Sequence, residues 1–197
     1  MSAQAATVLP YRPPRARNDA TAFLGLLLFL GSWAMMFSAL FFAYGVVRAH
    51  AGSWPPEGTP RLPLLLPGLN TLVIGASSFV LQRALASARA GRTAQVRPAV
   101  MGAIALGLVF LAAQGLLWSR LWSEGLRIDG GPYPSVFWAL TVFHALHVLV
   151  GLGGLAYLAA RSAGYGPARH LALRLWTGFW HFVGAVWLVL YLAVFVI

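Results

Sequence analysis

The sequence contains no cysteine and no lysine, and it has few charged residues of any kind. Without cysteine, disulfide bonds, thiolate metal sites, covalently attached c-type haem and cysteine-ligated copper are excluded. Charged residues make up 9% of the 197 residues and hydrophobic residues 59%, whereas a soluble domain carries roughly 25% charged residues. The polar surface is therefore too small for a water-facing globule, and lipid is the solvent that this composition fits.

Acidic residues are especially scarce, because the chain has only four and none lies deep within a long apolar run. A proton pump or relay needs groups that change charge inside the membrane, and these are usually Asp or Glu. A catalytic centre of redox metals needs more ligands than a few membrane histidines supply. The sequence therefore argues against both activities within this chain, and we expect no catalytic, cofactor-binding or metal-binding residue in it.

Five long apolar runs account for most of the chain, at residues 20–47, 62–86, 98–118, 135–160 and 175–197. Each is close to or above the roughly 20 residues that a helix needs to cross about 30 Å of hydrocarbon. Residues 1–19 are polar and rich in proline and arginine, which is typical of a loosely ordered tail. We therefore predict an all-α fold: a polytopic bundle of five transmembrane helices behind a cytoplasmic N-terminal tail.

The arginines are distributed unevenly between the two ends of the predicted bundle. Ten of the 14 fall at the end that holds the tail and the segments 87–97 and 161–174, and four fall at the other end. Because cytoplasmic segments carry the excess of positive charge, we predict a cell-membrane protein with its N-terminus in the cytoplasm and its C-terminus outside. Since the arginines lie between apolar runs and not along one helical face, nucleic-acid binding is not indicated.

Histidine is the ionisable residue that the apolar runs do contain. His144 and His147 are three positions apart and share a helical face, and His181 lies at a depth comparable to that of His147. Two such imidazoles could clamp a b-type haem, or they could hydrogen bond to hydroxyl groups or a lipid carbonyl. We favour a polar cluster that fixes helix packing or holds lipid, with a haem-bearing electron carrier as an alternative. The predicted cluster comprises His144, His147, His181, Asn70, Ser77, Ser78 and Trp180.

Segments of all five runs, in order, resemble motifs of haem–copper oxidase subunit III. Residues 143–152 resemble its FHxxHVxxGL signature, and residues 179–187 resemble YWHFVDxVW. Residues 69–78 are similar to LNTxxLxxSS, residues 31–44 to SExMFFxxLFxAY, and Gln114 stands where the family has the glutamine of a QAxE stretch. The similarity extends over about residues 20–197, and five ordered matches are far more specific than one HxxH motif.

The resemblance implies a non-catalytic subunit of a cytochrome c oxidase of aerobic respiration. It implies that the chain packs on the catalytic subunit I, binds phospholipid and supports proton uptake and stability, while haem and copper reside in partner subunits. Three residues, Trp33, Leu117 and Gly184, stand where the family has membrane acids. These departures keep open a related accessory subunit of a nitric oxide reductase. A transporter or an intramembrane hydrolase is disfavoured, because the chain has neither paired broken helices nor a GxSxG motif.

Overall fold

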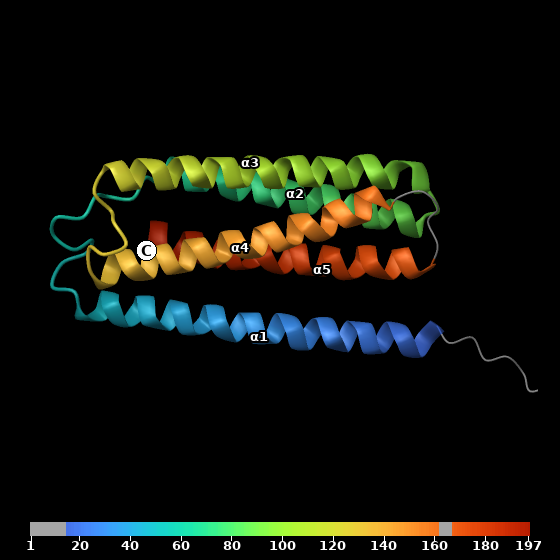
Figure 1. Ribbon diagram of the computed structural model, residues 1–197, viewed down its shortest axis with the longest axis horizontal. Helices are drawn as coiled ribbons and strands as arrows, with labels where there is room; N and C mark the ends of the chain where they lie inside the picture. Colours follow the sequence, from blue (N-terminus) through green and yellow to red (C-terminus); the bar gives the residue numbers. More distant parts are fainter. Residues whose placement is uncertain (1–14, 162–166) are drawn as a thin grey trace, which may run out of the picture.

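The structure is a computed structural model that describes residues 15–161 and 167–197. It consists of five long helices, and no strand occurs in the described part of the chain (Figure 1). The helices are α1 (Arg15–His50), α2 (Leu65–Arg89), α3 (Val96–Ser123), α4 (Pro132–Ala160) and α5 (Pro167–Leu190). A 3-10 turn, η1 (Thr93–Gln95), precedes α3, and a π-helical segment, η2 (Tyr191–Val196), continues α5. The predicted all-α bundle is confirmed, because five helices are long and apolar enough to cross a membrane.

Several helices extend beyond the apolar runs from which they were predicted. Helix α3 covers Val96–Ser123, not residues 98–118, because turns with Arg97 and Arg120 continue it at both ends. Long arginine side chains can reach from such positions to the membrane surface. Helix α1 takes in residues 15–19 of the predicted tail, and residues 1–14 of that tail lie outside the described residues. Hydrophobicity therefore locates the centres of the helices better than their ends.

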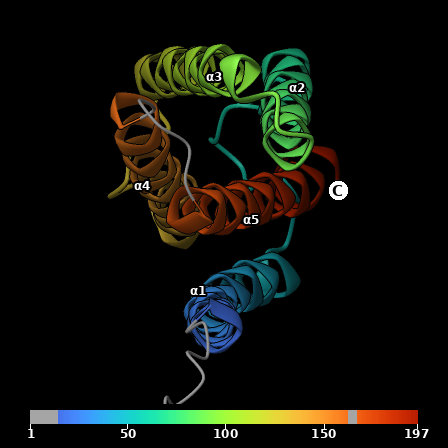
Figure 2. The ribbon, with the colours of Figure 1, turned by 90° about the vertical axis from the view of Figure 1, so that its right-hand side faces the viewer.

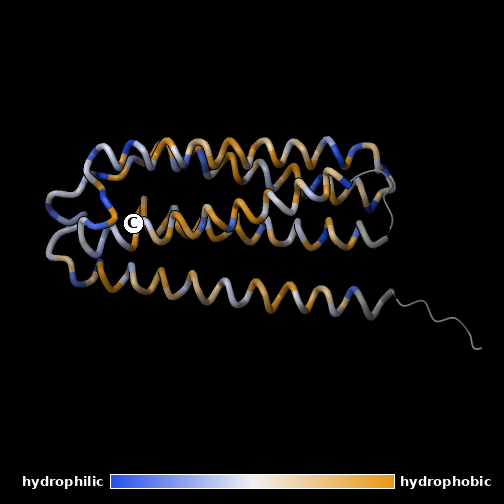
Figure 3. Tube along the Cα trace, in the orientation of Figure 1, coloured by the Kyte–Doolittle hydropathy of each residue, from blue (hydrophilic) through white to orange (hydrophobic). Residues whose placement is uncertain are grey.

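Helices α2, α3, α4 and α5 form a four-helix square, and α1 lies outside it against α4 and α5 (Figure 2). The N-terminal end of α1, the α2–α3 connection, the C-terminal end of α4 and the N-terminal end of α5 lie at one end of the molecule (Figure 1). The α1–α2 connection, the α3–α4 connection and the C-terminus meet at the other end. The middle turns of the helices are mainly hydrophobic, while polar residues gather at the two ends of the molecule (Figure 3).

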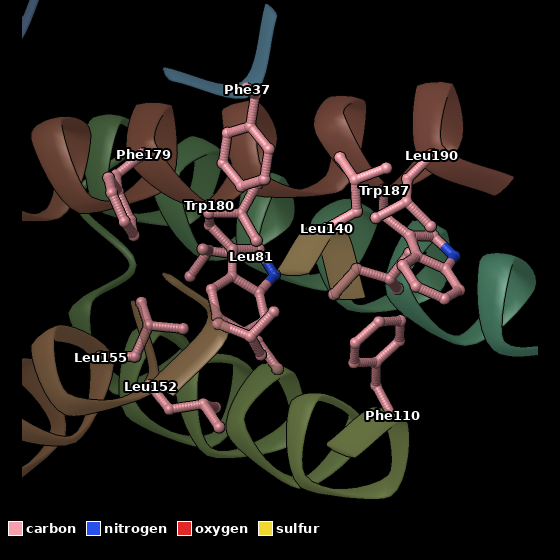
Figure 4. Packing of buried hydrophobic residues seen from close by; sticks show 14 of the residues in the cluster. Phe37, Leu81, Phe110, Leu140, Leu152, Leu155, Phe179, Trp180, Trp187 and Leu190 are labelled. Carbon is pink, nitrogen blue, oxygen red and sulfur yellow. The ribbon is translucent and has the colours of Figure 1, made fainter. Parts of the chain in front are cut away.

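The core lies inside the square and is built from large side chains. Trp180 and Trp187 of α5 are fully buried, and both lie between the helices together with Phe110 of α3 (Figure 4). Helix α1 adds little to this core: Phe37 is buried, whereas Met35 is 76% exposed. In lipid, an exposed apolar face of this kind is ordinary, because hydrocarbon is as apolar as the side chains. The bundle α2–α5 therefore holds the buried polar residues, and α1 covers one side of it.

A cluster of rings and one arginine fixes the end of α1 to the rest of the chain. The Arg48 guanidinium donates to the carbonyl oxygen of Ile197 at 2.5 Å and lies 5.2 Å from the centre of the Trp54 ring. The Trp54 ring in turn contacts Tyr44 of α1 and Tyr133 of α4 edge to face, with centroids 5.5 and 4.9 Å apart. These contacts tie α1, the α1–α2 connection, α4 and Ile197 together at one end.

Candidate functional site

Helix α4 carries His144 and His147 on its buried face, as their three-residue spacing predicts. His147 packs between α4 and α1, where its ring meets Trp33 edge to face and lies 5.0 Å from Phe37, centroid to centroid. Its Nδ1 hydrogen bonds to the carbonyl oxygen of Phe143, one turn earlier in the same helix. His147 is therefore a packing residue of the α1–α4 contact in this structure.

His144 lies deeper, inside the four-helix square, and is 1% exposed. Its ring is surrounded by aromatic rings from three other helices: Trp187 at 5.3 Å, Phe110 at 5.8 Å and Phe37 at 6.3 Å between centroids. Neither ring nitrogen has a hydrogen-bond partner among the described residues. The imidazole is therefore held by packing against these rings, and no described protein group forms a hydrogen bond with it.

Trp180 and Ser77 form the best-defined polar contact between helices. The Ser77 hydroxyl donates to the carbonyl oxygen of Ala103 at 2.8 Å and accepts a hydrogen bond from Trp180 Nε1 at 3.1 Å. One serine therefore joins α2, α3 and α5. The Trp180 ring lies against two glycines: a Cβ built at Gly107 or at Gly151 would come within 2.8 Å of ring atoms. Small residues allow this close approach of helices to the indole.

Asn70 and Ser78 occupy different surroundings from Ser77. The Asn70 amide donates to the carbonyl oxygen of Phe110 at 3.1 Å and is 2% exposed. Ser78 is half-buried and faces α5, where a Cβ on Gly184 would lie 3.3 Å from its hydroxyl oxygen. Gly184 is one of the positions at which motifs of the oxidase family have an acid. In this chain the glycine lets the backbone of α5 lie close to Ser78.

His181 lies apart from the other two histidines. Its Nε2 is 3.1 Å from Gln82 Oε1, so it pairs α5 with α2, whereas His147 contacts α1. The structure therefore does not bring His147 and His181 together as a haem clamp requires. Across the described residues, no group of three or more histidine, aspartate or glutamate side chains gathers in a way that could hold a metal ion.

The seven predicted residues are thus distributed over separate environments and do not form one cluster. Ser77 pairs with Trp180, His181 with Gln82, and His147 with the rings of α1. Their roles in packing or lipid binding stay predictions. Gln114 is not part of the predicted cluster, yet it is 1% exposed and its amide has no hydrogen-bond partner among the described residues. The signal for it was its place on the buried face of α3, four residues after Phe110.

Chemically, the site offers hydrogen bonds, ring contacts and imidazole side chains. Its imidazoles are not paired with a carboxylate, since the two ion pairs of the described chain, Arg120–Glu124 and Arg127–Asp129, lie at one end of the bundle. Such an arrangement orders helices and can bind neutral or amphipathic molecules.

Comparison with known proteins gives a consistent result. The family model described as cytochrome c oxidase subunit III matches residues 18–197. A cytochrome c oxidase subunit 3 of Synechocystis sp. is 36% identical over 176 residues, covering 88% of this chain and 74% of that protein. A probable cytochrome c oxidase subunit 3 of Nocardia farcinica is 37% identical over 175 residues, which cover 87% of this chain and 86% of that protein. The cytochrome c oxidase subunit 3 of Rattus norvegicus is 34% identical over 179 residues, which cover 87% of this chain and 67% of that protein.

Proposed function

This chain belongs to the cytochrome c oxidase subunit III family, and from that premise we propose that it packs on the catalytic subunit I of a haem–copper oxidase without an active site of its own. The observation that carries the proposal is the family match over residues 18–197, which includes all five membrane-spanning helices. Membership of an oxidase subunit family implies association with other oxidase subunits. The relatives are named as oxidase subunits, which favours oxygen over nitric oxide as the substrate of the complex.

The internal chemistry of the bundle supports a non-catalytic role. His147 contacts α1, His181 pairs with Gln82, and His144 is enclosed by aromatic rings. These placements use the imidazoles for packing and leave none of them facing another as paired ligands. We therefore assign the haem and copper of the complex to partner subunits, and we assign to this chain the stabilisation of the complex and of its proton uptake.

The distribution of charge supports a cytoplasmic N-terminus. In the sequence, ten arginines and one carboxylate, Asp19, fall in or near the N-terminal tail and the segments 87–97 and 161–174, while four arginines and three carboxylates fall near the other helix ends. Two of those four arginines are already paired, Arg120 with Glu124 at 2.8 Å and Arg127 with Asp129 at 3.7 Å. The difference in net positive charge is therefore larger than the arginine count alone suggests, and it favours the arginine-rich end as the cytoplasmic one.

A groove between α1 and α5 supports phospholipid binding. It has a volume of about 330 Å³ and is lined by Ala22, Gly25, Leu26, Phe29, Leu175, Trp176 and Phe179. Arg174 lies next to it, with its guanidinium 5.4 Å from the centre of the Phe23 ring. An acyl chain fits the apolar lining, and an anionic head group near Arg174 would gain about 1 kcal/mol from the charge. We propose this groove, between α1 and the four-helix square, as a lipid site.

Affinity purification tests the association with oxidase subunits. The chain would carry a tag on its N-terminal tail and be purified from native membranes in mild detergent, with an untagged strain as the control. We expect larger oxidase subunits in the eluate and a reduced-minus-oxidised spectrum with haem bands. Recovery of the tagged chain by itself, without oxidase subunits or haem absorbance, would contradict the proposal.

Lipid analysis of the same preparation tests the groove. We expect Arg174→Gln to retain less anionic phospholipid than the wild type when the bound lipid is measured by mass spectrometry. Arg120→Gln is the matched control, because Arg120 lies at the other end and is paired with Glu124. Equal lipid retention in the two variants would rule out Arg174 as a head-group contact while leaving the subunit assignment untouched.

A further inference from the structure

Three buried polar side chains inside the four-helix square have hydrogen-bonding atoms without a partner in the described part of the chain. These atoms are Asn70 Oδ1, both amide atoms of Gln114, and both ring nitrogens of His144. The three residues are only 2%, 1% and 1% exposed. Because an unmade hydrogen bond is costly in an apolar interior, buried polar atoms are nearly always satisfied by protein or by ordered water.

The register of α3 against α4 brings Gln114 and His144 to the same depth. Trp118 Nε1 of α3 donates to Thr141 Oγ1 of α4 at 3.2 Å. Further along, a Cβ on Gly107 would lie 2.8 Å from Leu152 Cδ2. Helices α3 and α4 are antiparallel, and both pairs fit the same register. This register places Gln114 level with Ala145, the residue next to His144. The difference in depth is therefore about one residue, or about 1.5 Å along the helix axis.

The register of α2 against α3 places Asn70 one helical turn away from Gln114 along α3. Asn70 Nδ2 donates to the carbonyl oxygen of Phe110 at 3.1 Å, and in an α-helix that carbonyl also accepts the backbone N–H of Gln114. The side chain of Asn70 thus lies at the turn of α3 between Phe110 and Gln114. The ring of Phe110 also contacts the ring of His144, 5.8 Å between centroids. We call Asn70, Gln114 and His144 the polar layer.

Trp187 of α5 covers the polar layer on its fourth side. Its ring lies 5.3 Å from His144 and 4.8 Å from Phe110, between centroids. Its own Nε1 donates to Thr71 Oγ1 at 3.0 Å, so the indole does not supply the missing hydrogen bonds. The polar layer is therefore enclosed by all four helices of the square and separated from lipid.

The unpartnered atoms specify the chemistry of a ligand. They include two amide oxygens that accept, one amide nitrogen that donates, and an imidazole that offers one donor and one acceptor when neutral. The four acidic residues of the chain, Asp19, Glu57, Glu124 and Asp129, all lie near helix ends or in connections, so a bound ion would lack a counter-charge here. A small neutral molecule that both donates and accepts hydrogen bonds fits the layer.

We propose that Asn70, Gln114 and His144 bind water inside the helix bundle. Buried water makes about three hydrogen bonds per molecule, so the five unpartnered atoms correspond to about two water molecules. This internal hydration site joins α2, α3 and α4 at the centre of the square. It gives the buried histidine a structural use that requires neither a metal nor a change of charge.

A map of the purified complex at about 2 Å resolution tests the proposal on the unmodified protein. We expect one or more compact density peaks within about 3.2 Å of polar atoms from at least two residues of the polar layer. Direct hydrogen bonds among the three side chains with no separate peak would overturn the proposal. Elongated lipid or detergent density, or a peak with metal-like distances of about 2.4 Å or less, would overturn it too.

A pair of glutamine variants provides an independent check. Gln114→Leu retains the approximate size of the side chain and removes both of its hydrogen-bonding atoms, so at least one peak should disappear. Gln82→Leu is the matched control, because Gln82 bonds to His181 outside the polar layer, and the peaks should persist in it. Peaks that remain unchanged in Gln114→Leu would overturn the assignment. If that variant does not accumulate, the wild-type map still decides.

Discussion

Trp180 is a buried side chain that two neighbouring helices approach closely through glycine, and replacing one of these glycines tests the packing directly. A Cβ at Gly151 would lie 2.8 Å from Cε3 of the indole and 3.2 Å from Cε1 of Phe179. A Cβ at Gly107 would lie 2.8 Å from Cη2, and the ring nitrogen is bonded to Ser77. The indole is thus held at several atoms, so the side chains or the helices around it must shift to admit the methyl group of Gly151→Ala.

The magnitude follows from two opposing terms. Inserting a methyl group into a packed core costs about 1–3 kcal/mol, while replacing glycine by alanine within a helix contributes about 1 kcal/mol of stability. Gly153 lies two residues away on the same helix, is exposed, and has nothing within 4 Å of a built Cβ. Because Gly153→Ala gains the same helix term without the clash, it should be more stable than Gly151→Ala by about 1–3 kcal/mol.

The assay is thermal inactivation of the purified complex, measured as the fraction of this chain that stays assembled in size-exclusion chromatography after heating. For a chain of this size, 1 kcal/mol corresponds to about 2–4 °C, so the midpoint of Gly151→Ala should lie about 2–12 °C below that of Gly153→Ala. Equal midpoints, or a higher midpoint for Gly151→Ala, would refute the reasoning, because the indole would then have room to move.

Two further predictions concern the serine pair and the orientation. Ser77→Ala leaves the N–H of Trp180 without an acceptor and should lower the free energy of unfolding by about 1–3 kcal/mol. Ser78→Ala, at a half-buried position, should change it by about 0.5 kcal/mol or less. Comparable midpoints for the two variants in the heating assay would contradict this difference. Because the chain has no cysteine, single-cysteine variants report orientation cleanly. Glu57→Cys should react with a membrane-impermeant maleimide in intact cells, and Thr93→Cys only after permeabilisation, so the reverse pattern would invert the proposed topology.

The number of helices could be predicted from the sequence because hydrocarbon thickness sets a minimum apolar length. The helix ends could not, because the turns around Arg97, Arg120 and Trp122 remain helical where the chain reaches the membrane surface. At that depth hydropathy no longer distinguishes helix from loop, and backbone hydrogen bonding continues regardless of composition. The bounds of α3 illustrate this at both of its ends.

The site was predictable only where residues share one helix. The spacing of His144 and His147 places both on one face of α4, and the structure has them there. Which helix each residue meets depends on the rotation of the neighbouring helices, and residue spacing within one helix does not reveal that rotation. Trp180 and His181 are adjacent, yet about 100° of helical rotation directs one to Ser77 and the other to Gln82.

Trp33 is one of the residues that differ from the motifs of the oxidase family, and its surroundings show what the tryptophan contacts. Trp33 stands where the family has a membrane acid, and its ring lies against His147. An aromatic ring therefore occupies the place from which a carboxylate would face an imidazole. Leu117, a second such position, is 1% exposed in the core, where an acid would need a partner. Both positions thus carry apolar side chains in this chain.

The proposal that this subunit contributes helix packing and no redox centre can be tested by determining which chain holds the haem. The tagged complex would be dissociated, and an absorption spectrum recorded for this chain alone and for the remaining subunits. We expect the haem absorbance to stay with the partner subunits, and we expect His147→Phe with His181→Phe to leave the haem content of the complex unchanged. A Soret band that remains with this chain and disappears in the double variant would contradict it.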